Sequence, residues 1–112
     1  MGSFFFPPVL NNNKIMKTLK VDIENKTYLF AINLKTILTF ESITNKVFQG
    51  QSTIDFLAFM YSALIANNDF SMEFDKFIDF MDAHPDLMFQ MTNLILQYYQ
   101  EKNESRNTSE CN

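Results

Sequence analysis

The stretch KTLKVDIENKTYLFAI, residues 17–32, decides the fold, because large apolar residues recur at every second position on both sides of a short polar break. Leu19, Val21 and Ile23 fall on one face of an extended chain, with charged residues between them. This alternation is typical of a strand that is buried on one side. The return segment places three apolar residues on one face: Tyr28, Phe30 and Ile32. We therefore predict a β-hairpin over residues 18–32, with ENK as its turn.

A short helix is predicted directly after the hairpin, in LKTILTFESI. Asn33 precedes it and can cap its first turn through the side-chain oxygen. The apolar residues recur at helical spacing: Leu34, Ile37, Leu38 and Ile43. Thr44, Asn45 and Lys46 end the helix, because asparagine adopts the left-handed conformation at little energetic cost.

The next helix is predicted in TIDFLAFMYSALIANN, with Ser52 or Thr53 as its cap and Asp55 in its first turn. It carries two apolar stripes. The first comprises Ile54, Leu57, Ala58, Tyr61, Leu64 and Ile65, and the second comprises Phe56, Phe59, Met60 and Ala63. A helix that is apolar over so much of its circumference must lie centrally in the domain or against a neighbour.

Two further helices are predicted before the polar C-terminus. SMEFDKFIDFMDA begins with Ser71 as its cap, and PDLMFQMTNLILQYYQ begins at Pro85. The first of these two helices buries Phe74, Phe77, Ile78 and Met81. The last helix again has two stripes, one with Leu87, Met88, Met91, Leu94, Ile95 and Tyr98 and one with Phe89, Leu96 and Tyr99.

The predicted fold class is α+β and predominantly helical, with an N-terminal β-hairpin followed by about four α-helices. With 112 residues, the chain suits one small domain, which we place at residues 16–100. Residues 1–15 are expected to form a flexible arm without the basic start of a signal peptide, and Met16 is a possible second start site. Residues 101–112 are expected to be a disordered polar tail.

Composition narrows the classes of partner. The net charge of −4 disfavours a nucleic-acid partner, because binding to phosphates depends on clustered lysine and arginine. Cys111 is the single cysteine, so the chain cannot form an internal disulfide, and we expect a reducing compartment. No apolar stretch approaches the roughly 20 residues that a membrane span requires. We therefore expect a soluble protein that binds neither membrane nor nucleic acid.

No catalytic constellation is present in the sequence. His84 is the single histidine and falls in a turn between helices, where a polar residue is expected anyway. The acidic series Asp69, Glu73, Asp75, Asp79, Asp82 and Asp86 lacks the glycine-containing loop of a calcium site. We interpret this series as a solvated face with a weak attraction for a basic partner. With two glycines and no phosphate-binding or nucleophile motif, the chain is expected to be no enzyme, with no catalytic, cofactor or metal site.

Surplus apolar surface is the remaining functional signal. The chain has 13 phenylalanines and seven methionines, and a domain of this size has a limited interior for bulky side chains. Most of these residues are expected in the core. Some of the others are expected to face a partner or a second copy, which makes the chain a predicted homo-oligomer. The candidates for partner binding are Phe56, Phe59, Met60, Phe89, Leu96 and Tyr99.

Over residues 17–100, the order of segments resembles that of phage tail assembly chaperones. The resemblance rests on the strand-turn-strand KTLKVDIENKTYLFAI, the helix start NLKTILTFE, the turn FESITNK and the helix STIDFLAFMYSAL. In that family a glycine commonly follows the threonine of the turn, and here Asn45 stands in its place. The resemblance implies that Phe40 and Glu41 with Thr44 fix the corner between hairpin and helix, which is a structural role.

The resemblance further implies a protein of a long-tailed phage or prophage, located in the host cytoplasm. Members of the family bind the tape-measure protein, keep it soluble while the tail assembles, and leave before the virion is complete. The family often produces a frameshifted longer form, and the tail from Glu101 is a possible junction. Two alternatives remain open: a small regulatory or antitoxin-like binding protein, and a structural head-tail connector of the virion.

Overall fold

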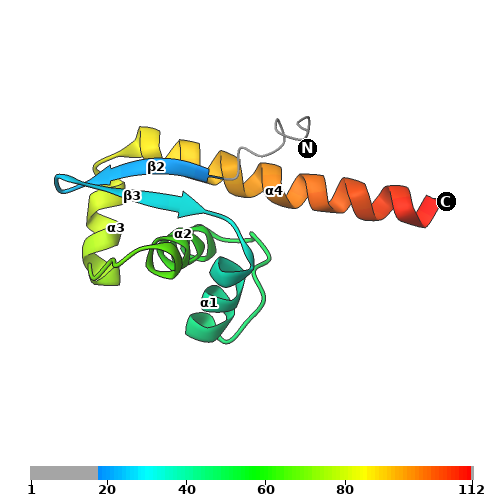
Figure 1. Ribbon diagram of the computed structural model, residues 1–112, viewed down its shortest axis with the longest axis horizontal. Coiled ribbons are helices and arrows are strands. Elements are labelled where there is room, and N and C mark those ends of the chain that lie inside the picture. The colour runs from blue at the N-terminus through cyan, green and yellow to red at the C-terminus, as the bar shows by residue number, and fades with distance from the viewer. Residues whose placement is uncertain (1–17, 112) are drawn as a thin grey trace, which may run out of the picture.

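The computed structural model describes residues 18–111, and side chains as far as residue 102. The predicted arm at residues 1–15 and the start site at Met16 lie outside the described residues. A hairpin of two strands is followed by four helices, which confirms the predicted α+β class (Figure 1). The elements are β2 (Thr18–Ile23), β3 (Lys26–Ala31), α1 (Leu34–Thr44), α2 (Thr53–Asn67), α3 (Phe74–Asp82) and α4 (Pro85–Cys111).

The hairpin is antiparallel and buries one face, as its alternating sequence predicts. Val21 lies opposite Tyr28, and Leu19 lies opposite Phe30. Val21, Ile23 and Phe30 are buried, whereas the residues between them on β2 are exposed. Two residues with positive φ, Glu24 at 51° and Asn25 at 72°, form the turn. Such turns match the right-handed twist of the two strands and so fix the register of the hairpin.

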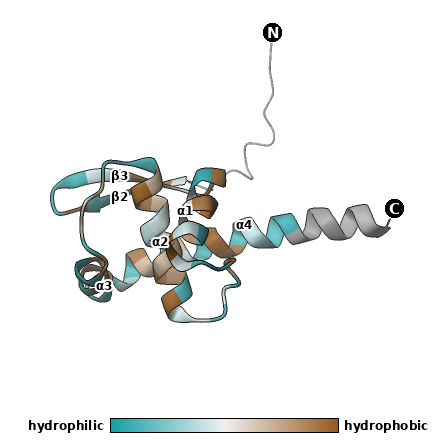
Figure 2. Ribbon diagram, turned by 90° about the horizontal axis from the view of Figure 1, so that it is seen from below, coloured by the Kyte–Doolittle hydropathy of each residue, from teal (hydrophilic) through white to brown (hydrophobic). Residues whose placement is uncertain are grey.

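The buried face of the hairpin lies across the helices, with β3 against α2 and β2 against α4. Helix α1 packs on α2, and α3 packs on the start of α4. Figure 2 shows hydrophobic segments on the helices in the middle of the fold, whereas the hairpin turn is hydrophilic. The largest fully buried side chains are Phe30, Phe40, Phe59 and Phe77. One aromatic core therefore holds the hairpin and all four helices together.

The outer edge of β3 is capped by side chains from α1 and from the end of α2. The Leu29 N–H donates to Oδ1 of Asn68 at 2.9 Å, and Nδ2 of Asn68 donates back to the Leu29 carbonyl at 2.9 Å. Two residues further along β3, the Ala31 carbonyl accepts from Oγ1 of Thr36 at 2.7 Å. Because an unpaired strand edge invites pairing with other chains, these amide and hydroxyl groups protect the β3 edge.

Helix boundaries follow the predicted caps in α1 and α2. Oδ1 of Asn33 accepts from the Thr36 N–H at the start of α1, and Asn45 ends the helix at φ 59°. Ser52, and not Thr53, caps α2 by accepting from the Asp55 N–H. These groups satisfy backbone donors and acceptors that have no partner inside the helix.

At the corner that the phage-chaperone resemblance singles out, Phe40 is fully buried in the core. Oγ1 of Thr44 donates to the Phe40 carbonyl at 2.8 Å. The carbonyl of Glu41 accepts from the Asn45 N–H at 2.8 Å. The three residues therefore lie at the end of α1, next to the left-handed residue that ends it. The hairpin joins α1 at its other end, through Asn33, so the implied role at the corner between hairpin and helix is wrong.

The predicted start of α3 at Ser71 is wrong. The helix begins at Phe74, and Glu73 occupies the cap position without a side-chain hydrogen bond. Tertiary contacts hold the preceding residues in a non-helical conformation, because Phe70 is buried against Tyr28 and the Tyr61 hydroxyl donates to the Met72 carbonyl at 2.6 Å.

Helix α4 continues to Cys111, where the sequence predicts a disordered tail from residue 101. Extending a packed helix adds one hydrogen bond per residue without the cost of a new nucleus. No proline or glycine follows Pro85, so nothing in the local sequence interrupts the helix. Its second half runs out from the body of the fold (Figure 1).

Candidate partner-binding groove

An open apolar groove lies where the first half of α2, the end of α3 and the start of α4 meet. We call it the helical groove, and its volume is about 560 Å³. It is lined by Thr53, Leu57, Ile78, Asp79, Met81, Asp82, Pro85, Met88, Phe89 and Thr92. The volume falls within the range of about 300–1,000 Å³ that is usual for ligand sites. Its apolar lining suits large apolar side chains of another molecule.

A second hollow continues the helical groove toward the loop before α2. The two hollows share three lining residues, Thr53, Met88 and Thr92. Gly50 and Phe56 lie on the wall of the second hollow. Gly50 has φ +64°, and a Cβ there would meet the ring of Phe56 at 3.4 Å. Glycine is therefore favoured at this position by the backbone conformation, which a residue with a side chain adopts only at a cost.

Two of the six predicted partner-binding residues line these hollows, and a third is exposed further along α4. Phe89 is 67% exposed and lines the helical groove. Leu96 is 50% exposed and lies two helical turns further along the same face of α4. Phe56 is half-buried and lines the second hollow, with its ring 5.3 Å from that of Phe48. These three side chains remain candidates for contact with a partner.

Phe59 and Met60 are fully buried, so the expectation that they face a partner is corrected. The ring of Phe59 lies 4.6 Å from that of Phe48 and 5.7 Å from that of Phe40. Helix α2 lies between α1 and the hairpin, and this position turns the stripe that carries Phe59 and Met60 toward the core. In the folded state neither side chain offers surface to another molecule.

Tyr99 is also drawn toward the core, although it remains partly accessible. Its ring lies 5.3 Å from that of Phe48 and 6.1 Å from that of Phe59. Burial raises the pKa of the Tyr99 hydroxyl to about 12, with smaller contributions from Tyr98 and Glu41. Tyr99 therefore anchors α4 to the loop between α1 and α2 more than it offers a contact surface.

The helical groove is acidic at its margin. Asp79 and Asp82 line it, and Asp86 follows Pro85 at the start of α4. The lining residues of the two hollows include no lysine, arginine or histidine. The ring of nearby His84 stacks on that of Phe80, with 4.0 Å between the ring centres. Nδ1 of His84 lies 2.7 Å from the Phe80 carbonyl oxygen. These aspartates are exposed, which agrees with the solvated face interpreted from the sequence. The sequence did not show that two of them lie beside the apolar residues of the groove.

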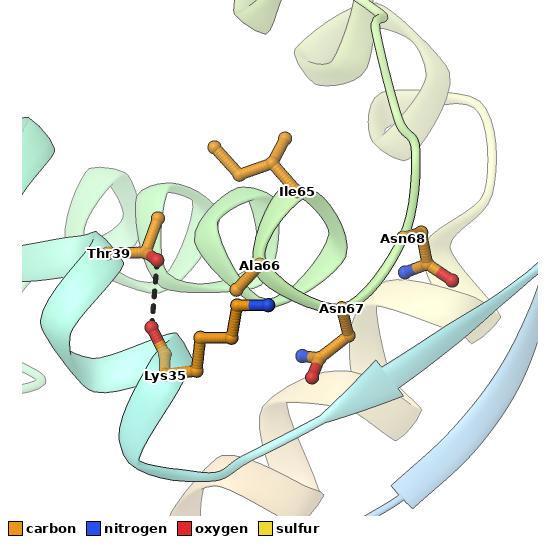
Figure 3. Close-up of a pocket in the computed structure, with 6 residues that line it drawn as sticks. All are labelled: Lys35, Thr39, Ile65, Ala66, Asn67 and Asn68. Atoms are coloured by element: carbon orange, nitrogen blue, oxygen red, sulfur yellow. Dashed lines mark hydrogen bonds between the residues drawn. The ribbon is translucent and has the colours of Figure 1, made fainter.

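Figure 3 shows a different hollow, between α1 and the end of α2, lined by Lys35, Thr39, Ile65, Ala66, Asn67 and Asn68. Its amide groups already have structural partners. Nδ2 of Asn67 donates to the Ala63 carbonyl at 2.8 Å, and its Oδ1 accepts from Nδ2 of Asn33 at 2.9 Å. Oγ1 of Thr39 donates to the Lys35 carbonyl at 2.8 Å. The hollow is therefore a junction of the fold, and the helical groove is the better candidate for binding.

Within residues 18–102, no group of three or more histidine, cysteine or acidic side chains is placed to hold a metal ion. Among the described helices, none combines the length and apolar character of a membrane span. Comparisons with models of protein families, with curated proteins and with solved structures give no match. The case for a function therefore rests on the residues and the geometry of the groove.

Proposed function

We propose that the chain is a phage tail assembly chaperone, which binds the tape-measure protein and keeps it soluble during tail assembly. The observation that carries this proposal is the open helical groove with Phe89 exposed on its wall. The resemblance of residues 17–100 to such chaperones supplies the identity of the client. In this proposal the chain acts by binding alone, in the host cytoplasm, and is absent from the finished virion.

The groove suits a helical client. An amphipathic helix can lay its apolar face into a groove of this kind, with contacts every three or four residues. Met88 lines the groove and is partly exposed, and its unbranched, polarizable side chain adapts to apolar partners of different shape. One site can therefore hold several apolar segments of a long client.

The expected binding is reversible. Burying one large side chain such as Phe89 contributes about 1.5–3 kcal/mol, and the loss of freedom on association opposes it. A few such contacts give moderate affinity at each site, so that many copies can cover a long client and leave as the tail tube replaces them. Tight binding at each site would hinder this release.

The proposal is tested by co-expressing the chain with the tape-measure protein of the same genome and measuring the soluble fraction of that protein. Phe89→Asp should abolish the gain in solubility, because it places a charge on the wall of the groove. Leu34→Asp is the matched control, since Leu34 is 69% exposed on α1, away from the groove, and an acidic residue is favourable at a helix start. Equal rescue by both variants would remove the groove from the proposed function.

A further inference from the structure

The helical groove lies at the one end of the fold where the charge of the chain is concentrated. Residues 73–86 hold five of the 13 acidic residues and one of the nine basic residues, with the single histidine neutral. Their net charge is −4, which equals that of the whole chain, so the remaining residues are balanced. Two of these five carboxylates, Asp79 and Asp82, line the apolar groove.

The carboxylates follow the wall of the groove in a regular row. Asp75, Asp79 and Asp82 are exposed and recur at i, i+4 and i+7 on α3, which places them along one side of the helix over about 10 Å. Asp79 and Asp82 line the groove beside Ile78 and Met81. The wall that α3 gives to the groove therefore places two carboxylates beside apolar side chains within one helical turn, and Asp75 continues the acidic side of the helix by one more turn.

We infer that the groove selects a basic amphipathic helix, with large apolar side chains on one face and lysine or arginine one to two turns apart along the flank. This inference rests on the proposed function and specifies the class of segment that the site takes. Charges of opposite sign at an interface steer encounter and fix register, whereas like charges exclude wrong partners. An acidic or neutral helix of the same apolar pattern would leave the row of aspartates without partners.

Two synthetic helical peptides test the inference. Both carry the same leucine pattern, and they differ only in flanking residues, lysine in one and glutamate in the other. Each contains one tryptophan, which gives a clean fluorescence signal because the protein has none. At low salt the lysine peptide should bind at least about tenfold more tightly, a difference of about 1.4 kcal/mol. The preference should shrink strongly near 1 M salt, where the screening length is about 3 Å.

Charge-removal variants assign the preference to the groove. Asp79→Asn with Asp82→Asn should remove most of the preference for lysine while the affinity for the apolar pattern persists. The matched control, Glu24→Gln with Asp69→Asn, removes the same charge at exposed positions outside the groove and should retain the preference. Phe89→Asp should weaken the binding of both peptides.

Contrary outcomes are distinguishable. Equal affinities for the two peptides, or no binding of the lysine peptide, overturn the inference, whereas the solubility assay independently decides the proposed function. If the control pair lowers the preference for lysine as much as Asp79→Asn with Asp82→Asn does, the preference comes from net charge, and the groove is not the site. A wild-type dimer that Phe89→Asp converts to monomer, without peptide binding, would assign the groove to a second copy of the chain.

Discussion

Phe59 and Phe89 have the same side chain in opposite environments. Phe59 has no exposed surface and packs among the rings of Phe40 and Phe48, whereas Phe89 is 67% exposed at the groove. Sequence analysis assigned both phenylalanines to apolar stripes and predicted that both face a partner. Position in a stripe shows that a residue lies on an apolar face, and tertiary packing decides whether that face is covered.

Alanine substitutions should separate the two residues. Phe59→Ala should lower the free energy of unfolding by about 3–5 kcal/mol, because it leaves a cavity in a packed core. Phe89→Ala should change it by less than about 0.5 kcal/mol, because the ring is mostly in solvent. Urea unfolding followed by circular dichroism measures both. A small effect at Phe59 would contradict the burial described above.

Tyr99 makes stability depend on pH in the alkaline range. Its pKa is raised from 10.0 to about 12, chiefly by burial. The folded state therefore keeps a proton that the unfolded chain releases above pH 10. The stabilisation is complete below pH 10 and is lost as pH rises toward about 12.

Tyr99→Phe should flatten this part of the pH profile, because phenylalanine has no proton to lose. The expected readout is the urea midpoint measured at several pH values from 9 upward, with the wild-type midpoint falling more steeply. Tyrosinate absorbance gives a second measurement, in which the variant should lack the latest-titrating group. An unchanged slope in the variant would show that Tyr99 does not cause the loss.

At the scale of elements, the end of α2 fixes the hairpin. Asn68 donates to the carbonyls of Leu29 and Leu64 and accepts from the Leu29 N–H. Asn67 links the same turn to Asn33 and to the Ala63 carbonyl. Two neighbouring amides therefore join the end of α2 to β3 and to the cap of α1, more than 30 residues earlier in the sequence.

Two substitutions of Asn68 should differ in a specific way. Asn68→Ala removes all three hydrogen bonds and should destabilise the fold by about 2 kcal/mol, with faster hydrogen exchange at the Leu29 amide. Asn68→Asp keeps an acceptor for that amide, so the amide should stay protected, although the carboxylate now faces two carbonyl oxygens. Equal exchange rates at Leu29 in the two variants would contradict the proposed contact.

The elements were largely predictable because their signals are local. Alternation in residues 18–32 gave the hairpin, and Asn33, Asn45 and Pro85 gave boundaries that the structure confirms. The prediction was wrong at Ser71, where burial of Phe70 by distant rings decides the backbone conformation. It was also wrong after residue 100, because a helix already packed upstream continues through a polar segment that would not form a helix alone.

At the scale of the whole molecule, the groove could not be predicted from stripes. Leu57, Ile78 and Met88 were assigned to predicted helix faces, but a groove forms only where three helices leave a space between those faces. The useful local signal was the alternation of apolar and acidic residues in IDFMD, residues 78–82, immediately before Pro85. Its meaning depends on how α3 turns into α4, which is a tertiary property.

The proposed chaperone should be absent from completed phage particles. Quantitative mass spectrometry of purified virions should detect the tape-measure protein without this chain, whereas lysates sampled during assembly should contain both. A structural head-tail connector would instead be found in the particles at a fixed ratio to the tail proteins. Detection of the chain in intact virions would contradict the proposed role.

The amide cap on β3 determines how the protein is expected to aggregate on heating. Leu29 is capped by Asn68 at the end of α2 and not by a third strand. Fraying of that single turn therefore bares the Leu29 backbone in the middle of β3, while Thr36 still holds Ala31 and the core stays packed. A bared strand recruits extended segments from other chains. The first aggregates should therefore contain near-native subunits joined by intermolecular β-structure, and they should form below the temperature of global unfolding.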